Sequence, residues 1–171
     1  MTLAEEITVQ KNVSAEMRDG TTLVTDVYRP AENGEYPVLL TRLPYGKDQS
    51  INPEYMNPIK AAQHGYIVIL QDVRGRFDSE GAWYPFVNEF EDGYDAVEWT
   101  AGLPGSNGKV GMYGASYPGM TQWQAAVMRP PALKVNRYPF RFYKQVGGEI
   151  PRPTARRRAR GTLRAGDGGL E

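Results

Sequence analysis

Two stretches near the start of the chain mix apolar and polar positions in the manner of strands with one covered face. They run over residues 7–17 and 21–30, and the turn-forming residues Arg18, Asp19 and Gly20 lie between them. A pair of this kind, joined by a short turn that contains glycine, favours a β-hairpin. We therefore expect the sheet to begin with two antiparallel strands.

Two later runs are apolar without alternation, which is typical of strands covered on both faces. They span residues 36–41 and 66–72, and residues 109–113 are predicted to form a third, short strand. Loops are expected over residues 42–47 and 73–88. Helices are predicted over residues 58–64, 91–100 and 120–128, with Gly65 and Gly102 placed where the first two would end. This alternation predicts an α/β fold with a parallel sheet.

Composition agrees with a globular α/β protein, since 40% of residues are hydrophobic and the chain has 19 Gly and 13 Pro. The absence of cysteine excludes disulfides and thiolate zinc sites. No basic segment followed by an apolar run opens the chain, and no stretch approaches the roughly 20 apolar residues that cross a bilayer. We expect a cytoplasmic protein that does not contact membranes.

Charge is divided unevenly along the chain. Residues 1–134 carry 11 Lys and Arg against 17 Asp and Glu, whereas residues 135–171 carry 9 against 3. Beyond Lys134 the chain consists largely of Arg, Gly, Pro and Ala, and a stretch with so little apolar pattern cannot offset its ordering entropy. We predict a partial α/β-hydrolase domain over 1–134 and a basic tail over 135–171 that is disordered or of frameshifted origin.

A serine stands between the short strand predicted over 109–113 and the helix that follows it, in Gly114-Ala115-Ser116-Tyr117-Pro118-Gly119. A strand-turn-helix of this kind forces the serine into a strained backbone conformation, so small residues are needed near it. The helix that begins there directs free N–H groups at an oxyanion formed beside the serine. The turn could also be only a tight connection or a helix cap, but the strand before it and the helix after it favour a nucleophile.

Four segments, taken in order, resemble the cocaine-esterase and X-Pro dipeptidyl-peptidase-like (CocE/NonD) serine hydrolases. These segments are residues 17–20 with 26–30, residues 42–47, residues 71–81 and residues 108–122. In that family Pro118 fits the usual S-Y-x-G form of the serine turn. The resemblance implies the N-terminal half of an α/β-hydrolase fold, with an incomplete sheet, acting on small ester or amide (peptide) substrates.

The resemblance also assigns roles to three residues. Ser116 would be the nucleophile that forms an acyl-enzyme, and the oxyanion would be held by the Tyr45 hydroxyl and the Tyr117 backbone N–H. Without the resemblance, Tyr45 would be read as a loop aromatic that packs on the core. No cofactor or metal is implied.

A serine needs a base, normally a histidine oriented by a carboxylate. The sequence has one histidine, His64, which precedes the serine and cannot satisfy the order Ser, Asp or Glu, His. We therefore expect a truncated hydrolase with little activity of its own. We also expect the strand over 109–113 to be an uncovered, aggregation-prone edge and the chain to be partly molten.

A second hypothesis is a non-catalytic binding fragment whose run from Arg156 to Arg160 contacts nucleic acid or an acidic partner. It is the weaker one, because no aromatic is interleaved for base stacking. The acidic residues at the predicted helix start are explained by the helix dipole rather than by a metal site; they are Glu89, Glu91, Asp92 and Asp95.

Overall fold

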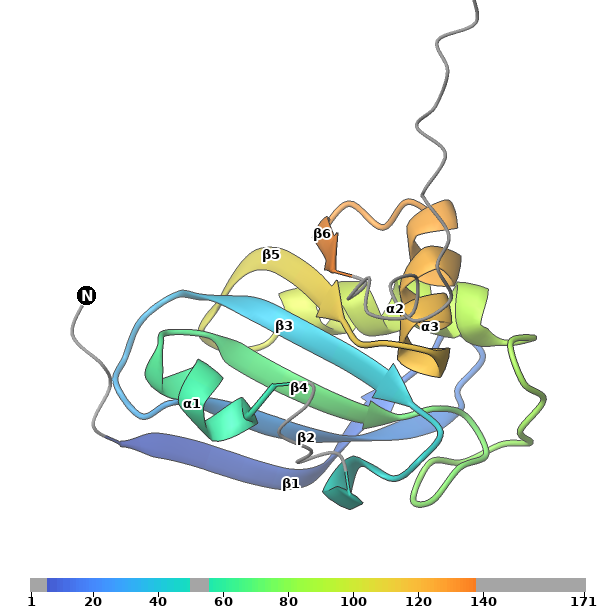
Figure 1. Ribbon diagram of the computed structural model, residues 1–171, viewed down its shortest axis with the longest axis horizontal. Helices are drawn as coiled ribbons and strands as arrows, with labels where there is room; N and C mark the ends of the chain where they lie inside the picture. Colours follow the sequence, from blue (N-terminus) through green and yellow to red (C-terminus); the bar gives the residue numbers. More distant parts are fainter. Residues whose placement is uncertain (1–5, 50–55, 138–171) are drawn as a thin grey trace, which may run out of the picture. The chain divides into compact units, whose positions relative to one another are not determined.

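A six-stranded mixed sheet forms the centre of the fold (Figure 1), with the strand order β1-β2-β4-β3-β5-β6. The computed structural model describes residues 6–49 and 56–137. The strands are β1 (Ile7–Glu16), β2 (Thr22–Pro30), β3 (Tyr36–Leu43), β4 (Ile67–Asp72), β5 (Ser106–Tyr113) and β6 (Leu133–Arg137). The helices are η1 (Lys47–Gln49), α1 (Pro58–Gln63), α2 (Glu89–Ala101) and α3 (Tyr117–Val127). The predicted α/β fold is confirmed.

The N-terminal hairpin is confirmed, because β1 and β2 pair antiparallel over nearly their whole length. Gly20, at φ 81°, allows the turn between them, as a residue without a Cβ can adopt this conformation at little cost. A bulge interrupts the register between Gln10 and Val13. Strand β2 then pairs antiparallel with β4, so the hairpin continues into the rest of the sheet.

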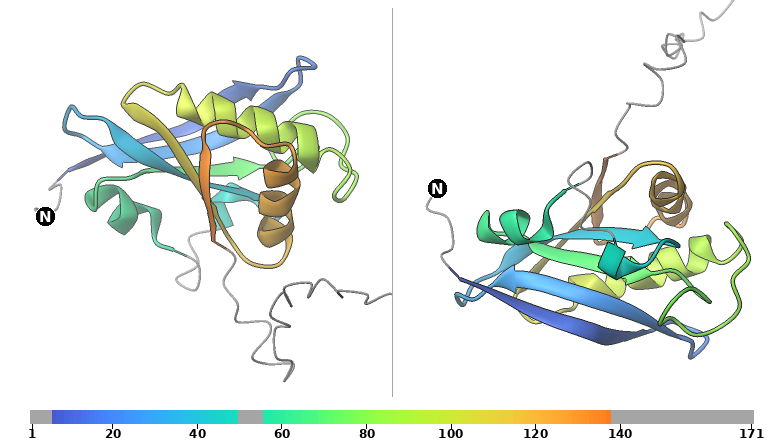
Figure 2. Two further views of the ribbon diagram at one scale, coloured as in Figure 1. Left: turned by 90° about the horizontal axis from the view of Figure 1, so that it is seen from above. Right: turned by 60° about the horizontal axis from the view of Figure 1, so that its bottom comes forward.

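The parallel part of the sheet consists of β4, β3, β5 and β6. All six residues of β4 are buried, and its side chains alternate between two apolar clusters. Ile67 and Ile69 join the cluster that holds Val97 of α2 and Ala125 of α3. Val68 and Leu70 join Ala61 and Ala62 of α1 on the other face. Helices α1 and α2 accordingly lie on opposite faces of the sheet (Figure 2), which explains why this strand shows no alternation in sequence.

Strand β6 was not predicted, and its presence corrects the expectation that β5 would be an uncovered edge. Residues Val110 to Tyr113 of β5 pair in parallel with β6. The alternation of Leu133 and Val135 with polar neighbours was the available signal for this strand. Strand β6 has five residues, and a short edge strand limits pairing with other chains. An uncovered edge at β5 is therefore no longer a reason to expect a partly molten chain.

Several element boundaries differ from the prediction, and two of these differences affect the serine turn and the loop over 42–47. Helix α3 begins at Tyr117 rather than Met120, because Pro118 occupies its first turn, where a missing N–H costs no hydrogen bond. Strand β3 continues through Leu43, so the expected loop over 42–47 is reduced to its middle residues. Most of the predicted basic tail, including the run from Arg156 to Arg160, lies outside the described residues. No helix in the described part of the chain is long and apolar enough to span a bilayer.

Candidate active site

Tyr45 and Ser116 are placed at the same edge of the sheet by its topology. Strands β3 and β5 are parallel neighbours, so their carboxyl ends meet there. Tyr45 follows the end of β3 and Ser116 follows the end of β5. The rings of Tyr45 and Tyr117 meet edge to face, with centroids 6.5 Å apart. The structure therefore brings the three sequence-predicted residues together, at the edge where open α/β sheets bind ligands.

Ser116 occupies a strained turn and its side chain is exposed. Its backbone has φ 58° and ψ −123°, although it is not a glycine. A conformation of this kind costs about 1–3 kcal/mol and is found where function requires it. Gly114, two residues earlier, has φ 134°, and a Cβ placed there would lie 2.4 Å from Pro118 Cβ. The need for a small residue at 114 is thus a matter of space as well as of backbone angle.

The turn is held from inside by side chains of α3. Gln122 donates from Nε2 to the carbonyl oxygens of Gly114 at 2.9 Å and Pro118 at 3.0 Å. Thr121 donates from Oγ1 to the Pro118 carbonyl at 3.0 Å. Both side chains are buried, with Gln122 1% exposed. These bonds oppose relaxation of the strained serine.

The backbone N–H groups beside Ser116 differ in whether the described residues offer them an acceptor. The N–H groups of Gly119 and Met120 donate to the Ser116 carbonyl at 2.9 and 3.1 Å, and Pro118 has no N–H. The Tyr117 N–H, at the first position of α3, donates to no acceptor within residues 6–49 and 56–137. It also lies at the positive end of the helix dipole.

The loop that carries Tyr45 is anchored on both sides of that residue. Arg76 donates from Nε to the Pro44 carbonyl at 3.0 Å, and the Lys47 N–H donates to Asp72 Oδ1 at 2.8 Å. The Tyr45 side chain is 51% exposed, and its hydroxyl makes no hydrogen bond within the described part of the chain. A fixed loop thus presents this phenolic hydroxyl just beyond the carboxyl end of β3.

The Tyr117 side chain is held much more tightly. Its hydroxyl donates to Glu89 Oε1 at 2.9 Å and accepts from the Phe86 N–H at 3.3 Å and Trp83 Nε1 at 3.4 Å. Its ring stacks on Phe86, with centroids 4.4 Å apart. Burial, and then the charge of Glu89, raise the pKa of the hydroxyl above its ordinary value of 10.0, so it keeps the proton that it donates.

Acidic side chains at the start of α2 form ion pairs with arginines. Glu89 and Asp92 are each 2% exposed. Glu89 Oε2 accepts from Arg42 Nη1 at 2.6 Å, and Asp92 accepts from Nε and Nη2 of Arg74 at 2.9 and 2.6 Å. These partners, rather than the helix dipole alone, account for the buried carboxylates. No metal-binding group of three or more His, Asp or Glu is found over residues 6–49 and 56–137.

His64 is at the opposite end of the sheet from Ser116. It caps the C-terminus of α1, just before β4 begins, and its Nδ1 atom lies 2.6 Å from the Lys60 carbonyl oxygen. Strand β4 runs parallel to β5 through β3, and at about 3.3 Å per residue its two ends are about 16 Å apart. The only histidine of the sequence therefore cannot contact the Ser116 hydroxyl.

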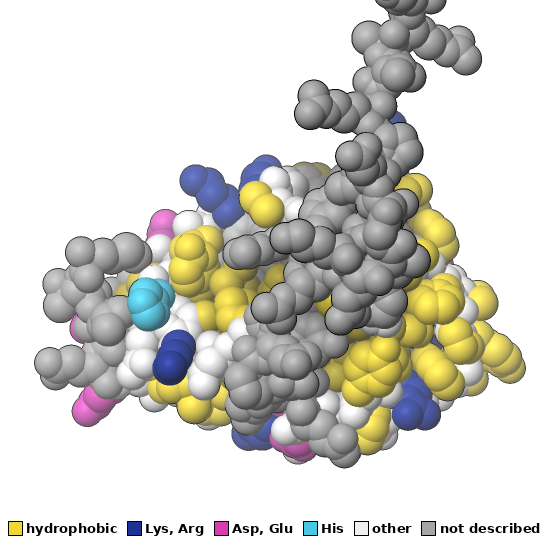
Figure 3. All heavy atoms as spheres, viewed as in Figure 1, with side chains coloured by type: hydrophobic (Ala, Val, Ile, Leu, Met, Phe, Trp, Pro, Cys, Tyr) yellow, Lys and Arg dark blue, Asp and Glu magenta, His cyan; other side chains and the backbone are white. Residues whose placement is uncertain are grey.

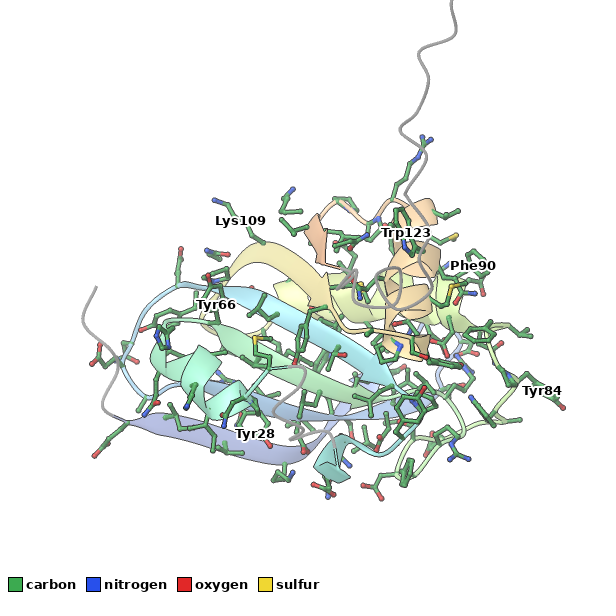
Figure 4. All side chains as sticks on the ribbon, viewed as in Figure 1. Tyr28, Tyr66, Tyr84, Phe90, Lys109 and Trp123 are labelled. Atoms are coloured by element: carbon green, nitrogen blue, oxygen red, sulfur yellow. The ribbon has the colours of Figure 1, made fainter. Side chains whose placement is uncertain are left out.

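Exposed apolar side chains gather around α3 and the loop over 73–88. Figure 3 shows hydrophobic side chains concentrated at this end of the molecule. Phe90 and Trp123 project from α2 and α3, and Tyr84 projects from the loop (Figure 4); they are 37%, 59% and 64% exposed. Apolar side chains are therefore exposed on neighbouring elements at the end of the molecule that carries the serine turn.

Sequence reasoning missed the residues that support the serine turn. Glu89 was assigned only to a helix start, and Arg42 and Phe86 were given no role. A buried charge cannot be read from a local pattern, because burial depends on which elements pack over it. Phe86, at φ 67°, is likewise visible as strained only in the structure.

Comparison with known proteins identifies hydrolases that this chain resembles in sequence and in fold. The chain is 43% identical over 128 residues to the cocaine esterase of Rhodococcus sp. (strain MB1 Bresler), covering 74% of this chain and 22% of the relative. It matches a CocE/NonD family hydrolase from Staphylococcus aureus at 32% identity and TM-score 0.72, covering 77% of this chain and 27% of that one. An aminopeptidase from a Thaumarchaeota archaeon matches at 28% identity and TM-score 0.67, with 80% and 26% covered.

The chain thus spans about a quarter of the length of these relatives. Residues 19–137, which include β2 to β6 and the serine turn, match the X-Pro dipeptidyl-peptidase (S15) family. This match covers well over half of the sequence. The chain belongs to the X-Pro dipeptidyl-peptidase (S15) family.

Proposed function

We propose that the chain carries the nucleophile and the oxyanion donors of a serine hydrolase that cleaves acyl ester or amide bonds. The observation that carries this proposal is the exposed Ser116 at φ 58° directly before α3. A strained backbone at an exposed serine, next to a helix N–H that has no acceptor in the described part of the chain, has no evident structural benefit. It is what nucleophilic attack on a carbonyl requires.

In the proposed reaction, Ser116 Oγ bonds to the substrate's carbonyl carbon and gives its proton to a base. The carbonyl oxygen becomes an oxyanion that accepts hydrogen bonds from the Tyr117 N–H and the Tyr45 hydroxyl. Collapse of this intermediate breaks the bond to the alcohol or amine, which leaves with a proton. Water then attacks the acyl-enzyme, releases the acid and restores Ser116.

The base is proposed to come from residues that these 171 do not include, because His64 lies at the far end of the sheet. A serine hydroxyl without a base is a weak nucleophile. The chain by itself is accordingly proposed to turn over little or no substrate. An external base such as imidazole can supply the missing proton transfer in a test.

For the substrate we propose a small ester or amide, taken up in a cytoplasmic setting. The apolar side chains beside the site favour apolar groups on either side of the scissile bond. The cocaine esterase and the aminopeptidase among the relatives support ester and peptide bonds as the range.

Phosphonylation of Ser116 tests the proposal. The 171-residue chain is incubated with a fluorophosphonate probe, with and without imidazole, and the modified residue is mapped by tandem mass spectrometry. We expect modification at Ser116, faster with imidazole, and none in Ser116→Ala. Modification of other serines at equal rates, or none at Ser116 in a folded chain with imidazole present, would refute the proposal.

A further inference from the structure

A continuous set of buried polar contacts connects the two elements that carry the proposed oxyanion donors. Arg42, near the end of β3, lies three residues before Tyr45 and is fully buried. It donates from Nη1 to Glu89 Oε2 at 2.6 Å and from Nε to Gln71 Oε1 at 2.7 Å. The other oxygen of Glu89 accepts from the Tyr117 hydroxyl at 2.9 Å.

Arg42 orients the Glu89 carboxylate, and that carboxylate orients the Tyr117 hydroxyl. The Glu89 carboxylate bridges a guanidinium and a phenol, so its two oxygens are both used. Charge-assisted hydrogen bonds of this kind are short and are stronger than neutral ones. In a buried site an unpaired carboxylate or guanidinium is costly, which gives the arrangement little freedom to change.

Tyr117 is also clamped from the loop over 73–88. Phe86 donates its N–H to the Tyr117 hydroxyl at 3.3 Å, and its carbonyl accepts from Gln124 Nε2 at 2.6 Å. The loop is thereby bound to α3 at two points, through the N–H and through the carbonyl oxygen of Phe86. Because the Tyr117 backbone directly follows Ser116, a fixed side chain limits rotation of the serine turn.

We propose that Glu89, held by Arg42, is a positioning residue for the serine turn, which fixes the Tyr117 side chain and thereby the Tyr117 N–H. This inference rests on the proposed function for its catalytic meaning. Glu89 itself touches no substrate atom in this proposal. Its effect passes through the phenol of Tyr117 to the backbone donor.

Two variants remove the contact in different ways. Tyr117→Phe keeps the ring, the stack on Phe86 and the backbone N–H, and deletes only the hydroxyl. Glu89→Gln keeps the shape and removes the charge that pairs with Arg42. The matched control is Asp95→Asn. Asp95 lies on the same helix as Glu89 and pairs with Arg18 of the N-terminal hairpin, with 2.8 Å between Asp95 Oδ1 and Arg18 Nη2, and this pair does not include Tyr117.

Two measurements are made on the 171-residue chain. Hydrogen exchange is followed at the Gly119 and Met120 amides, whose bonds to the Ser116 carbonyl report on the serine turn. The fluorophosphonate rate at Ser116 is measured against probe concentration with imidazole present. We expect faster exchange at both amides in both variants, and a maximal labelling rate lowered about tenfold. Removing an oxyanion donor lowers the reaction rate by a factor of about 10²–10³, and displacing the donor lowers it by part of that factor.

The half-saturating probe concentration should stay unchanged, and Asp95→Asn should match the unmodified chain in both readouts. Unchanged exchange in Tyr117→Phe would overturn the inference, whatever the labelling shows. Equal losses in Asp95→Asn would also overturn it, because they would reflect general destabilisation. Absence of labelling in the unmodified chain would instead contradict the proposed function, and the exchange data would still decide whether Glu89 holds the turn.

Discussion

Replacing Gly114 by alanine tests whether the serine turn is as crowded and strained as the structure shows. The added Cβ would lie 2.4 Å from Pro118 Cβ and 3.2 Å from Thr41 Oγ1, and φ at this position is 134°. Neither neighbour can move freely, because Pro118 belongs to the first turn of α3 and Thr41 is buried in β3. We expect Gly114→Ala to destabilise the fold and to displace Ser116.

The magnitude follows from two separate costs. A backbone conformation unfavourable for an L-residue costs about 1–3 kcal/mol. Overpacking by one methyl group in a filled region typically costs about 1–3 kcal/mol more. The sum, about 2–6 kcal/mol, is a large part of the roughly 5–15 kcal/mol by which a domain is stable. Urea unfolding followed by tryptophan fluorescence measures it, with a constant m-value as the check that the denatured state is unchanged.

Gly111→Ala is the matched control, since Gly111 lies in β5, three residues before Gly114, and its φ is not in the left-handed region. A Cβ there would have its nearest contact at 3.5 Å, with Leu39 Cδ2. We expect the free energy of unfolding of this variant to lie within about 0.5 kcal/mol of that of the unmodified chain. If Gly114→Ala were as stable as Gly111→Ala, the close approach of Gly114 to α3 would be wrong and the geometry of the serine turn would have to be revised.

Three further outcomes are expected. Tyr45→Phe should lower the fluorophosphonate rate at Ser116 by about 10²-fold or more. Its unfolding free energy should stay within about 0.5 kcal/mol of that of the unmodified chain, since the exposed hydroxyl has no hydrogen-bond partner among the residues that the structure describes; an unchanged rate would remove Tyr45 from the oxyanion site. Arg42→Met should cost about 3–5 kcal/mol in urea unfolding by leaving Glu89 buried and unpaired, whereas Arg18→Met, which breaks a half-exposed pair, should cost about 1 kcal/mol or less. Stability should fall as pH rises past about 10, because burial raises the pKa of three tyrosines in the folded state, so that unfolding releases their protons; they are Tyr28, Tyr113 and Tyr117. Thermal melts across that range, with tyrosinate absorbance, would show a flat profile if these phenols titrated normally.

Local pattern was enough to locate most elements because their signals are short-range. The hairpin, the buried strands β3, β4 and β5 and the loop over 73–88 all depend on residues close together in sequence. The serine turn was also recognisable, since the steric need for Gly114 and the helix after Ser116 are properties of neighbouring residues. Strand β6 was not predicted, although Leu133 and Val135 alternate with polar residues as in a strand. It lies where the charge and composition of the chain change near Lys134, and that change favoured a disordered tail.

The sequence by itself determined that a serine would project from a bend between a buried strand and a helix, because backbone strain and helix formation are local. Only the tertiary structure decided which side chains surround that serine. Arg42, Glu89 and Tyr117 are far apart in the chain, and they meet because parallel strands place their ends at one edge and α2 packs over them. The same packing separates His64 from Ser116 by the length of the sheet, so the one histidine of the chain is excluded from the site by geometry.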